Sequence, residues 1–291
     1  MFSISWLIPC WPFKRSQSTE QPIKQTANTT EDGLKLLYEG ESPQVDIVAV
    51  HGLGGHREKS WTTKSGVNWL QSLLPVDLPN TRIHTWGYAS TYTDDPETPQ
   101  DTSERLVSEL FAMRKMTGTL SRPIIFIAHS FGGTIVKSAL LFSHNSREER
   151  TLCLRNISLS THGVIFMGTP ELDSRLSGLQ AFLESNATAE TGSSGAQKEA
   201  RWMLDTLQQY STIGSKFKTL YAYESLNSRS QTTPSVSQRL TPSILVDATH
   251  ENMVKFESSL DEGYIKIKES IRDMIHSARE RELREKAEVT S

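Results

Sequence analysis

Short runs of apolar and β-branched residues alternate along this chain with longer stretches whose apolar residues recur at helical spacing. Runs that are apolar at nearly every position are typical of strands buried on both faces of a sheet. The first run, Leu34–Tyr38, is predicted to be an edge strand. The other predicted strands are Val45–Val50, Arg82–Tyr88, Ile124–Ala128, Gly163–Met167, Thr219–Tyr223 and Ser243–Val246.

Between these runs the apolar period changes to that of a helix. Helices are predicted over Ser103–Met113, Gly133–Phe142 and Tyr264–Ile275. Residues 185–200 are small and polar, which predicts a connector that serves either as part of a lid or as a passive loop. Strands that alternate with helices indicate the α/β class, with a mostly parallel central sheet flanked by helices. In such sheets the functional site lies at the carboxyl ends of the strands.

The two ends of the chain differ in character from the middle. We expect an apolar N-terminus and polar linker over residues 1–33, a single α/β domain over residues 34–275 and a charged, solvated tail over residues 276–291.

Residues 1–13 are apolar and precede Lys14 and Arg15, the reverse of the order in a secretory signal. Two interpretations remain open: weak contact with a membrane surface through residues 1–13, or a terminus that packs on the protein itself. A mitochondrial presequence is less favoured because arginine is scarce and no amphipathic pattern is visible.

Composition narrows the classes of function. The chain has 291 residues, and its 31 basic and 34 acidic residues give a net charge of −3, so it lacks the basic excess of a general nucleic-acid binder. No apolar run reaches the length of a membrane-spanning helix. The two cysteines rule out a disulfide scaffold and fit a reducing compartment. We therefore expect a globular, cytoplasmic protein, with association to a membrane as the alternative.

The strand Ile124–Ala128 runs directly into a serine and then into a predicted helix. This strand–turn–helix context is the one that a nucleophile elbow requires, and it makes Ser130 the candidate nucleophile. Residues two positions to either side must be small, and here they are Ala128 and Gly132. The usual pattern has glycine in place of Ala128, but one additional methyl group should fit. The alternative is a buried serine at a strand end.

A glycine-rich segment, His51–Gly55, follows the strand Val45–Val50. In hydrolases with a nucleophile elbow, the loop at this place supplies one oxyanion-hole N–H, and the residue after the nucleophile supplies the other. Leu53 and Phe131 are therefore the candidate donors.

The spacing of these glycines does not fit two other kinds of binding site. A dinucleotide-binding fingerprint that starts at Gly52 would need glycine at Arg57, and a phosphate-binding loop would need glycine at Leu53 and Glu58. A plain glycine turn remains open.

A serine nucleophile needs a base, and in this type of hydrolase the histidine follows the nucleophile along the chain. His250 comes after the strand Ser243–Val246 and a short loop, which places it at the carboxyl end of the sheet. His162 lies at the opposite end, His144 ends the helix that leaves the site, and His276 falls in the C-terminal helix. His250 is the candidate base, and the alternative is a surface-loop histidine.

A carboxylate must orient the histidine and stabilise its charged form. Glu224 follows the strand Thr219–Tyr223 at the correct end of the sheet, so it is the preferred candidate. Asp247 is the main rival, although it precedes His250 by only three residues. Asp173, in the loop after Gly163–Met167, is less favoured.

Several sequence blocks together resemble a known family. They are VDIVAVHGLGGHREKSWT, NWLQSLLP, RIHTWGY, IIFIAHSFGGTIVKSAL and GVIFMGTP, and they occur in the expected order within a resemblance that covers roughly residues 34–275. They resemble the lipase-like serine esterases of the α/β-hydrolase superfamily. The most similar group is the fungal branch, which includes hydrolase domains ahead of NACHT-type modules. This branch is related to the animal serine-active-site protein of phospholipid remodelling. The resemblance implies Ser130 as nucleophile and His250 as base, and it supports Glu224 as acid.

One block departs from the family pattern. The family commonly has a histidine followed by basic and small residues after the Gly-Thr-Pro at 168–170, whereas this chain continues with Glu171-Leu172-Asp173-Ser174. An acidic pair at this place would disfavour anionic headgroups.

These observations predict a serine hydrolase that cleaves a carboxylic ester or thioester through an acyl-enzyme on Ser130, with His250 as base and with no cofactor or metal. The expected substrate is a small-molecule or lipid ester. Alternatives are a hydrolase of a fungal biosynthetic intermediate, an acyl-transfer enzyme, and a catalytically silent interaction module that keeps the fold.

Overall fold

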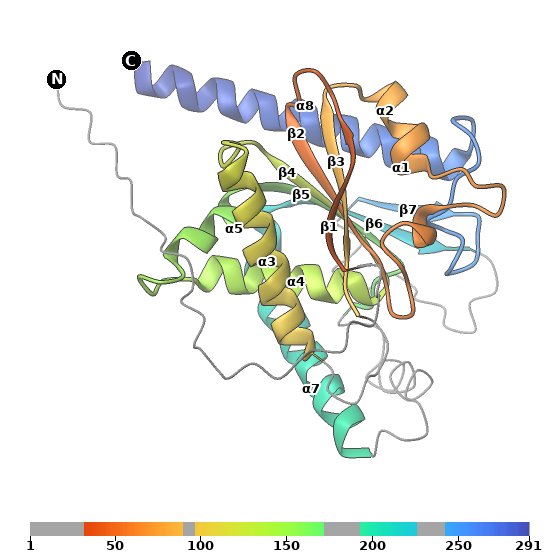
Figure 1. Cartoon of the computed structure of the whole chain (residues 1–291), viewed down its shortest axis with the longest axis horizontal. Helices are drawn as coiled ribbons and strands as arrows, with labels where there is room; N and C mark the ends of the chain where they lie inside the picture. The colour runs from red at the N-terminus through yellow and green to blue at the C-terminus, as the bar shows by residue number, and fades with distance from the viewer. Residues whose placement is uncertain (1–31, 90–96, 172–192, 226–241, 291) are drawn as a thin grey trace, which may run out of the picture.

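The computed structural model describes residues 32–89, 97–171, 193–225 and 242–290, and its centre is a seven-stranded sheet (Figure 1). The strand order is β1-β3-β2-β4-β5-β6-β7, and only β1 runs antiparallel to its neighbour. The strands are β1 (Gly33–Glu39), β2 (Val45–Val50), β3 (Thr81–Gly87), β4 (Ile124–His129), β5 (Thr161–Met167), β6 (Lys218–Glu224) and β7 (Ser243–Val246).

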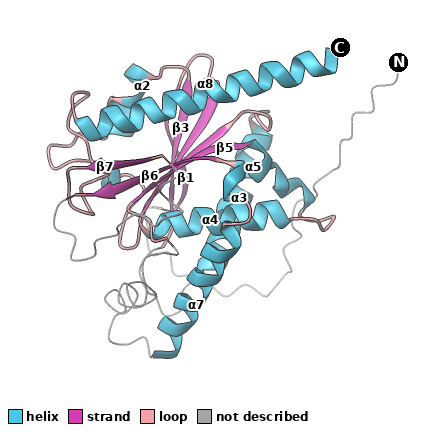
Figure 2. Ribbon diagram, turned by 180° about the vertical axis from the view of Figure 1, so that it is seen from behind, coloured by secondary structure: helices cyan, strands magenta, loops and turns pink. Residues whose placement is uncertain are grey.

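Helices cover both faces of the sheet (Figure 2). One face packs against α3 (Pro99–Met116), α4 (Phe131–Asn145), α5 (Arg155–Ser160) and α7 (Ser193–Tyr210). The other packs against α1 (Trp69–Ser72), α2 (Leu74–Asp77) and α8 (Glu262–Thr290). Three short 3-10 turns are η1 (Lys59–Trp61), η2 (Leu152–Leu154) and η3 (Gly214–Lys216).

Two hydrophobic cores result from the alternation of side chains along each strand. In β2, Ile47 and Ala49 point into the core under α8, whereas Val48 and Val50 point into the core under α3 and α4. Every residue of this strand is buried. The continuously apolar sequence of the central strands is explained by this burial on both faces.

The structure confirms the seven predicted strands, with ends that differ by no more than two residues. The helix predicted over Ser103–Met113 begins earlier, at Pro99, because the side chain of Thr98 accepts a hydrogen bond from the Asp101 N–H and so caps it. The loop predicted over residues 185–200 is wrong in its second half, since α7 begins at Ser193. Its first half lies outside the described residues.

The helix predicted over Tyr264–Ile275 is the docked part of α8. Tyr264, Ile267, Ile271 and Met274 are buried in the core beneath it. The helix continues without interruption to Thr290, and the side chains of residues 282–288 are exposed, as expected for a solvated tail. Residues 1–13 and most of the predicted linker lie outside the described residues. None of the helices in the described ranges combines the length and apolar character needed to cross a bilayer.

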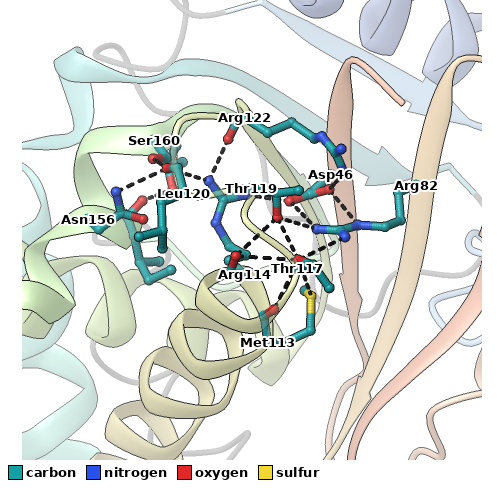
Figure 3. A network of polar contacts seen from close by, with 12 residues as sticks. Asp46, Arg82, Met113, Arg114, Thr117, Thr119, Leu120, Arg122, Asn156 and Ser160 are labelled. Atoms are coloured by element: carbon teal, nitrogen blue, oxygen red, sulfur yellow. Dashed lines mark hydrogen bonds and ion pairs between the residues drawn. The ribbon is translucent and has the colours of Figure 1, made fainter. Parts of the chain in front are cut away.

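A buried ionic cluster joins the amino ends of the strands (Figure 3). Asp46 of β2 is fully buried, and it accepts hydrogen bonds from Arg82 at 2.9 and 3.0 Å, from Arg122 at 3.0 Å and from Arg114. Burial lowers the pKa of Arg114 to about 10, despite its contact with Asp46. The cluster ties β2, β3 and α3 together at the edge opposite the predicted site.

The architecture is that of an α/β-hydrolase, in agreement with the sequence prediction. A mostly parallel sheet carries helices on both faces, and β4 passes through a sharp turn directly into α4. This turn and the loops after β2, β6 and β7 all lie at the carboxyl edge.

Candidate active site

Ser130 occupies the turn between β4 and α4. Its φ of 52° and ψ of −126° make it the one non-glycine residue with a positive φ among those the structure describes. Its N–H donates to the Met167 carbonyl oxygen at 2.8 Å, which fixes the turn against β5. A side chain at Gly132 would overlap the carbonyl oxygen of His51, so the turn needs glycine there. The methyl group of Ala128 lies in the core without conflict.

His250 lies beside this turn, in the loop after β7. The His129 Nε2 lies 2.9 Å from the His250 carbonyl oxygen, and the two rings are 4.9 Å apart. On another side, the His250 ring abuts Gly168: a Cβ at Gly168 would lie only 2.9 Å from its Cε1. Gly168 directly follows Met167, the acceptor of the Ser130 N–H. The structure therefore brings His250 and Ser130 to the same edge of the sheet.

Glu224, the last residue of β6, faces His250. Its Oε1 is 3.5 Å from His250 Nδ1, and its side chain is 8% exposed. Burial alone would raise the pKa of Glu224, but the hydrogen bond with His250 and nearby positive charge outweigh burial and lower it. Glu224 is therefore the carboxylate that can orient the base.

The rival carboxylates differ in position. Asp247 is exposed and accepts a hydrogen bond from Ser225 Oγ at 2.7 Å, so its carboxylate is engaged with Ser225. Asp173 lies outside the described residues.

Ser130, Glu224 and His250 thus lie at the same edge of the sheet, in the turn after β4, at the end of β6 and in the loop after β7. Within the described ranges, no hydrogen bond links Ser130 Oγ to His250. Such contacts are often long in ligand-free sites and tighten when a substrate is bound.

The predicted oxyanion donors, Leu53 and Phe131, belong to two segments next to Ser130. A Cβ at Gly52 would come within 2.8 Å of the Ser130 Cβ, so the loop that carries Leu53 runs closely past the serine. Phe131 begins α4, and its backbone N–H belongs to the first turn, where the peptide groups favour negative charge. The side chains of Leu53 and Phe131 pack against the same core.

His51 and Tyr88 brace the start of this loop. Their rings stack at 4.5 Å, the Tyr88 hydroxyl donates to the His51 carbonyl oxygen at 3.0 Å, and the Tyr88 N–H donates to His51 Nε2 at 3.4 Å. His51 Nδ1 in turn donates to the Gly52 carbonyl oxygen at 2.8 Å. Burial lowers the pKa of His51 to about 4, so the ring is neutral at pH 7 and supplies one donor and one acceptor.

We expect Tyr88→Phe to reduce hydrolysis of a p-nitrophenyl ester by roughly 3–10-fold, mainly in kcat, because it removes one hydrogen bond from the oxyanion loop and keeps the stacked ring. Steady-state kinetics would check this, with Tyr38→Phe as the control, since the Tyr38 hydroxyl donates to Pro79 on the edge of the sheet. Equal activity of Tyr88→Phe and the wild type would contradict the bracing role.

Sequence reasoning missed His129 and Tyr88. The sequence position of each residue could have indicated a place near the site, since His129 precedes the candidate nucleophile and Tyr88 follows the end of β3 at the carboxyl edge. Neither was singled out, because their contacts are made by loops that only the fold brings together.

Neither of two cavities in the described part of the chain contains the candidate triad. One, of about 680 Å³, lies between α3, α4 and α7, and the other, of about 530 Å³, lies beside β7. Trp202, which lines the larger cavity, contacts Phe131 with ring centroids 6.0 Å apart. Among the residues described, no cluster of three or more His, Cys, Asp or Glu side chains could hold a metal ion.

No protein-family model matches the chain. The chain is similar to Protein SERAC1 of Danio rerio, with 28% identity over 165 residues, and of Homo sapiens, with 27% identity over 169 residues. These alignments cover 48% and 50% of this chain, and only 24% and 25% of those longer proteins.

Among solved structures, the chain is similar to a haloalkane dehalogenase from Bradyrhizobium elkanii, with a TM-score of 0.48, 11% identity, and coverage of 87% of this chain and 95% of that one. It is also similar to a carboxylesterase from Nitrososphaera gargenis, with a TM-score of 0.46, 10% identity, and coverage of 86% and 98%. Since one fold hosts many chemistries, any function has to be argued from the site.

Proposed function

We propose that this protein is a serine hydrolase that cleaves a carboxylic ester or thioester through an acyl-enzyme on Ser130. The observation that carries the proposal is the strained turn of Ser130 beside the His250–Glu224 pair. Positive φ at a non-glycine residue costs free energy, and such strain persists mainly where the surrounding structure enforces it, often at functional sites. The turn displays the serine hydroxyl at the carboxyl edge, where the base also lies.

In the proposed reaction, His250 removes the proton from the Ser130 hydroxyl while Ser130 Oγ attacks the carbonyl carbon. Glu224 holds the imidazole through Nδ1 and stabilises its positive charge. His250 then passes the proton to the leaving alcohol or thiol as the tetrahedral intermediate collapses. Water, deprotonated by His250, attacks the acyl-enzyme and releases the acid and free Ser130.

The backbone N–H groups of Leu53 and Phe131 would stabilise the oxyanion that forms in both half-reactions. Loss of one such donor typically reduces the rate by about 10²–10³-fold. Because the loss of one donor is so costly, the contacts of His51 and Tyr88 that hold the loop in place should affect the rate of catalysis directly.

The resemblance of the sequence blocks to lipase-like serine esterases supports a lipid or small-molecule ester as substrate. With such a substrate, residues 1–13 would serve as a weak contact to a membrane surface for a cytoplasmic enzyme. A fungal biosynthetic intermediate and acyl transfer to an alcohol remain alternatives within the same chemistry.

The proposal is tested by labelling the purified protein with a fluorophosphonate probe, which reacts with activated serines. We expect covalent labelling of the wild type and its complete loss in Ser130→Ala. Ser225→Ala is the matched control, because Ser225 follows Glu224 at the same edge and bonds to Asp247. A folded wild-type protein that is neither labelled nor active on short-chain esters and thioesters would contradict the proposal and favour a silent interaction module.

A further inference from the structure

A lysine is buried in the interior behind the candidate nucleophile. Lys137, two turns into α4, has a side chain that is 1% exposed. Its ammonium group forms an ion pair with Glu171 and lies over the rings of Phe166 at 4.6 Å, Tyr210 at 5.5 Å and Tyr221 at 5.8 Å. The proposed hydrolysis gives neither charged residue a role.

Such a pair is costly, because the Lys137 ammonium loses its hydration and the Glu171 side chain is only 17% exposed. Lysine is almost never fully buried without a partner, and apolar residues of similar volume are often at least as stable as a buried pair. The stability of the folded protein therefore does not explain why this ion pair is present, whereas its location next to the candidate active site does offer a reason.

Residues 168–171 directly follow β5 and are called the loop 168–171; Glu171 is the fourth of them. Gly168, the first residue of this loop, has a φ of 60°, abuts the His250 ring and donates its N–H to the Ala222 carbonyl oxygen of β6 at 2.9 Å. Thr169 lies so close to the first turn of α4 that Gly133 has no space for a Cβ. The loop 168–171 is thus wedged between the nucleophile helix, the base and the strand that carries Glu224.

The charge of Glu171 acts on the same interior. Burial, and then the nearby Glu171 carboxylate, raise the pKa of Tyr210 and of Tyr223. Lys137 is the cation that pairs with the carboxylate within this group of aromatic rings. The sequence-based expectation that Glu171 would repel anionic headgroups therefore needs revision, because its charge is balanced by Lys137.

We propose that Lys137 is a positioning residue for the reaction, an inference that rests on the proposed function. Its ion pair with Glu171 holds the loop 168–171 in place, and Gly168 of this loop in turn fixes the His250 ring beside Ser130. Without its partner, the remaining buried charge draws the loop toward water. The wall behind His250 then moves, and the alignment of His250 with Ser130 is lost. Substrate contacts with the acyl group are not involved, so the effect falls on kcat.

The test uses the full chain and four variants: Lys137→Met, Glu171→Gln, the double variant and Arg122→Met. We measure the second-order rate of fluorophosphonate labelling, together with kcat and KM for p-nitrophenyl acetate. Each single variant should be slower by roughly 10–100-fold in labelling and kcat, the loss expected for a misplacement of about 1 Å, with KM changed less than about threefold. The double variant, which retains no unpaired charge, should recover most of the labelling rate.

Arg122→Met is the control for general destabilisation, because it weakens a buried ion pair at the opposite edge of the sheet. It should lower the melting temperature and leave the labelling rate of the folded protein unchanged. If Lys137→Met does not fold, the labelling rates of Glu171→Gln and of the double variant still test the positioning role.

Folded single variants that label as fast as the wild type would overturn the positioning role and leave the proposed function standing. A double variant as slow as the slower single variant would also overturn it. A wild type that shows no labelling would overturn both.

Discussion

His250→Ala is expected to reduce the acylation rate of Ser130 by roughly 10⁴–10⁶-fold, the largest loss of activity predicted for this protein. Without the imidazole, the Ser130 hydroxyl has no group to accept its proton, and at neutral pH it is a weak nucleophile. The residual rate would come from substrate binding and the oxyanion donors alone. The measurement is the initial burst of p-nitrophenol from a p-nitrophenyl ester, together with the rate of fluorophosphonate labelling.

His276→Ala is the matched control, since His276 lies exposed on α8 and pairs with Glu280 on the same helix. It should leave the burst unchanged. A His250→Ala variant that keeps more than about a tenth of wild-type acylation would show that another group serves as the base.

The same assay separates the two candidate acids. Glu224→Gln should reduce acylation by roughly 10²–10⁴-fold, because an amide cannot stabilise the imidazolium that forms in the transition state. Asp247→Asn should have little effect, since Asp247 bonds to Ser225. Because the pKa of Glu224 is lowered, its carboxylate remains charged at mildly acidic pH, and its orienting effect is lost only as the pH falls below the ordinary range of a glutamate.

The sequence was sufficient to predict the strands and the turn at Ser130. Buried runs such as Val45–Val50 have few alternatives to a central strand, and the chain order of strand, serine and helix is itself the signature of the elbow. His250 and Glu224 could be predicted because parallel strands bring their carboxyl ends to one edge, so that position along the chain implies position in space.

Contacts between distant loops could not be predicted in this way. Glu171 and Lys137 lie 34 residues apart, and nothing in either segment indicates that an acid at one would meet a buried cation at the other. The first turns of helix α7 were missed for a different reason. The start of the helix is rich in glycine and serine, which favour a loop, although the segment Ala196–Ala200 contains strong helix formers. The later turns of the helix are stabilised because Met203 and Leu207 are buried in the hydrophobic core.

Asp46→Ala is expected to lower the free energy of unfolding by roughly 3–5 kcal/mol, the largest loss of stability predicted here. Asp46 is the shared acceptor for Arg82, Arg114 and Arg122, and its removal leaves three positive charges close together, with the half-exposed Glu39 beside Arg82 as the nearest remaining carboxylate partner. The Nε of Arg114 already lacks a hydrogen-bond partner, so the loss of Asp46 would leave this guanidinium with a second unsatisfied donor group. A chain of this size should lose about 10 °C or more in melting temperature.

Urea denaturation would measure the loss, with Glu97→Ala as the matched control. Glu97 also accepts several hydrogen bonds from one arginine, Arg105, but both side chains are partly exposed, so its removal should cost less than about 1 kcal/mol. Because Asp46 lies at the amino edge of the sheet, the folded fraction of Asp46→Ala should keep wild-type reactivity at Ser130. An Asp46→Ala protein as stable as the Glu97→Ala control would show that the three arginines find other partners or water. The cluster would then be dispensable for joining β2, β3 and α3.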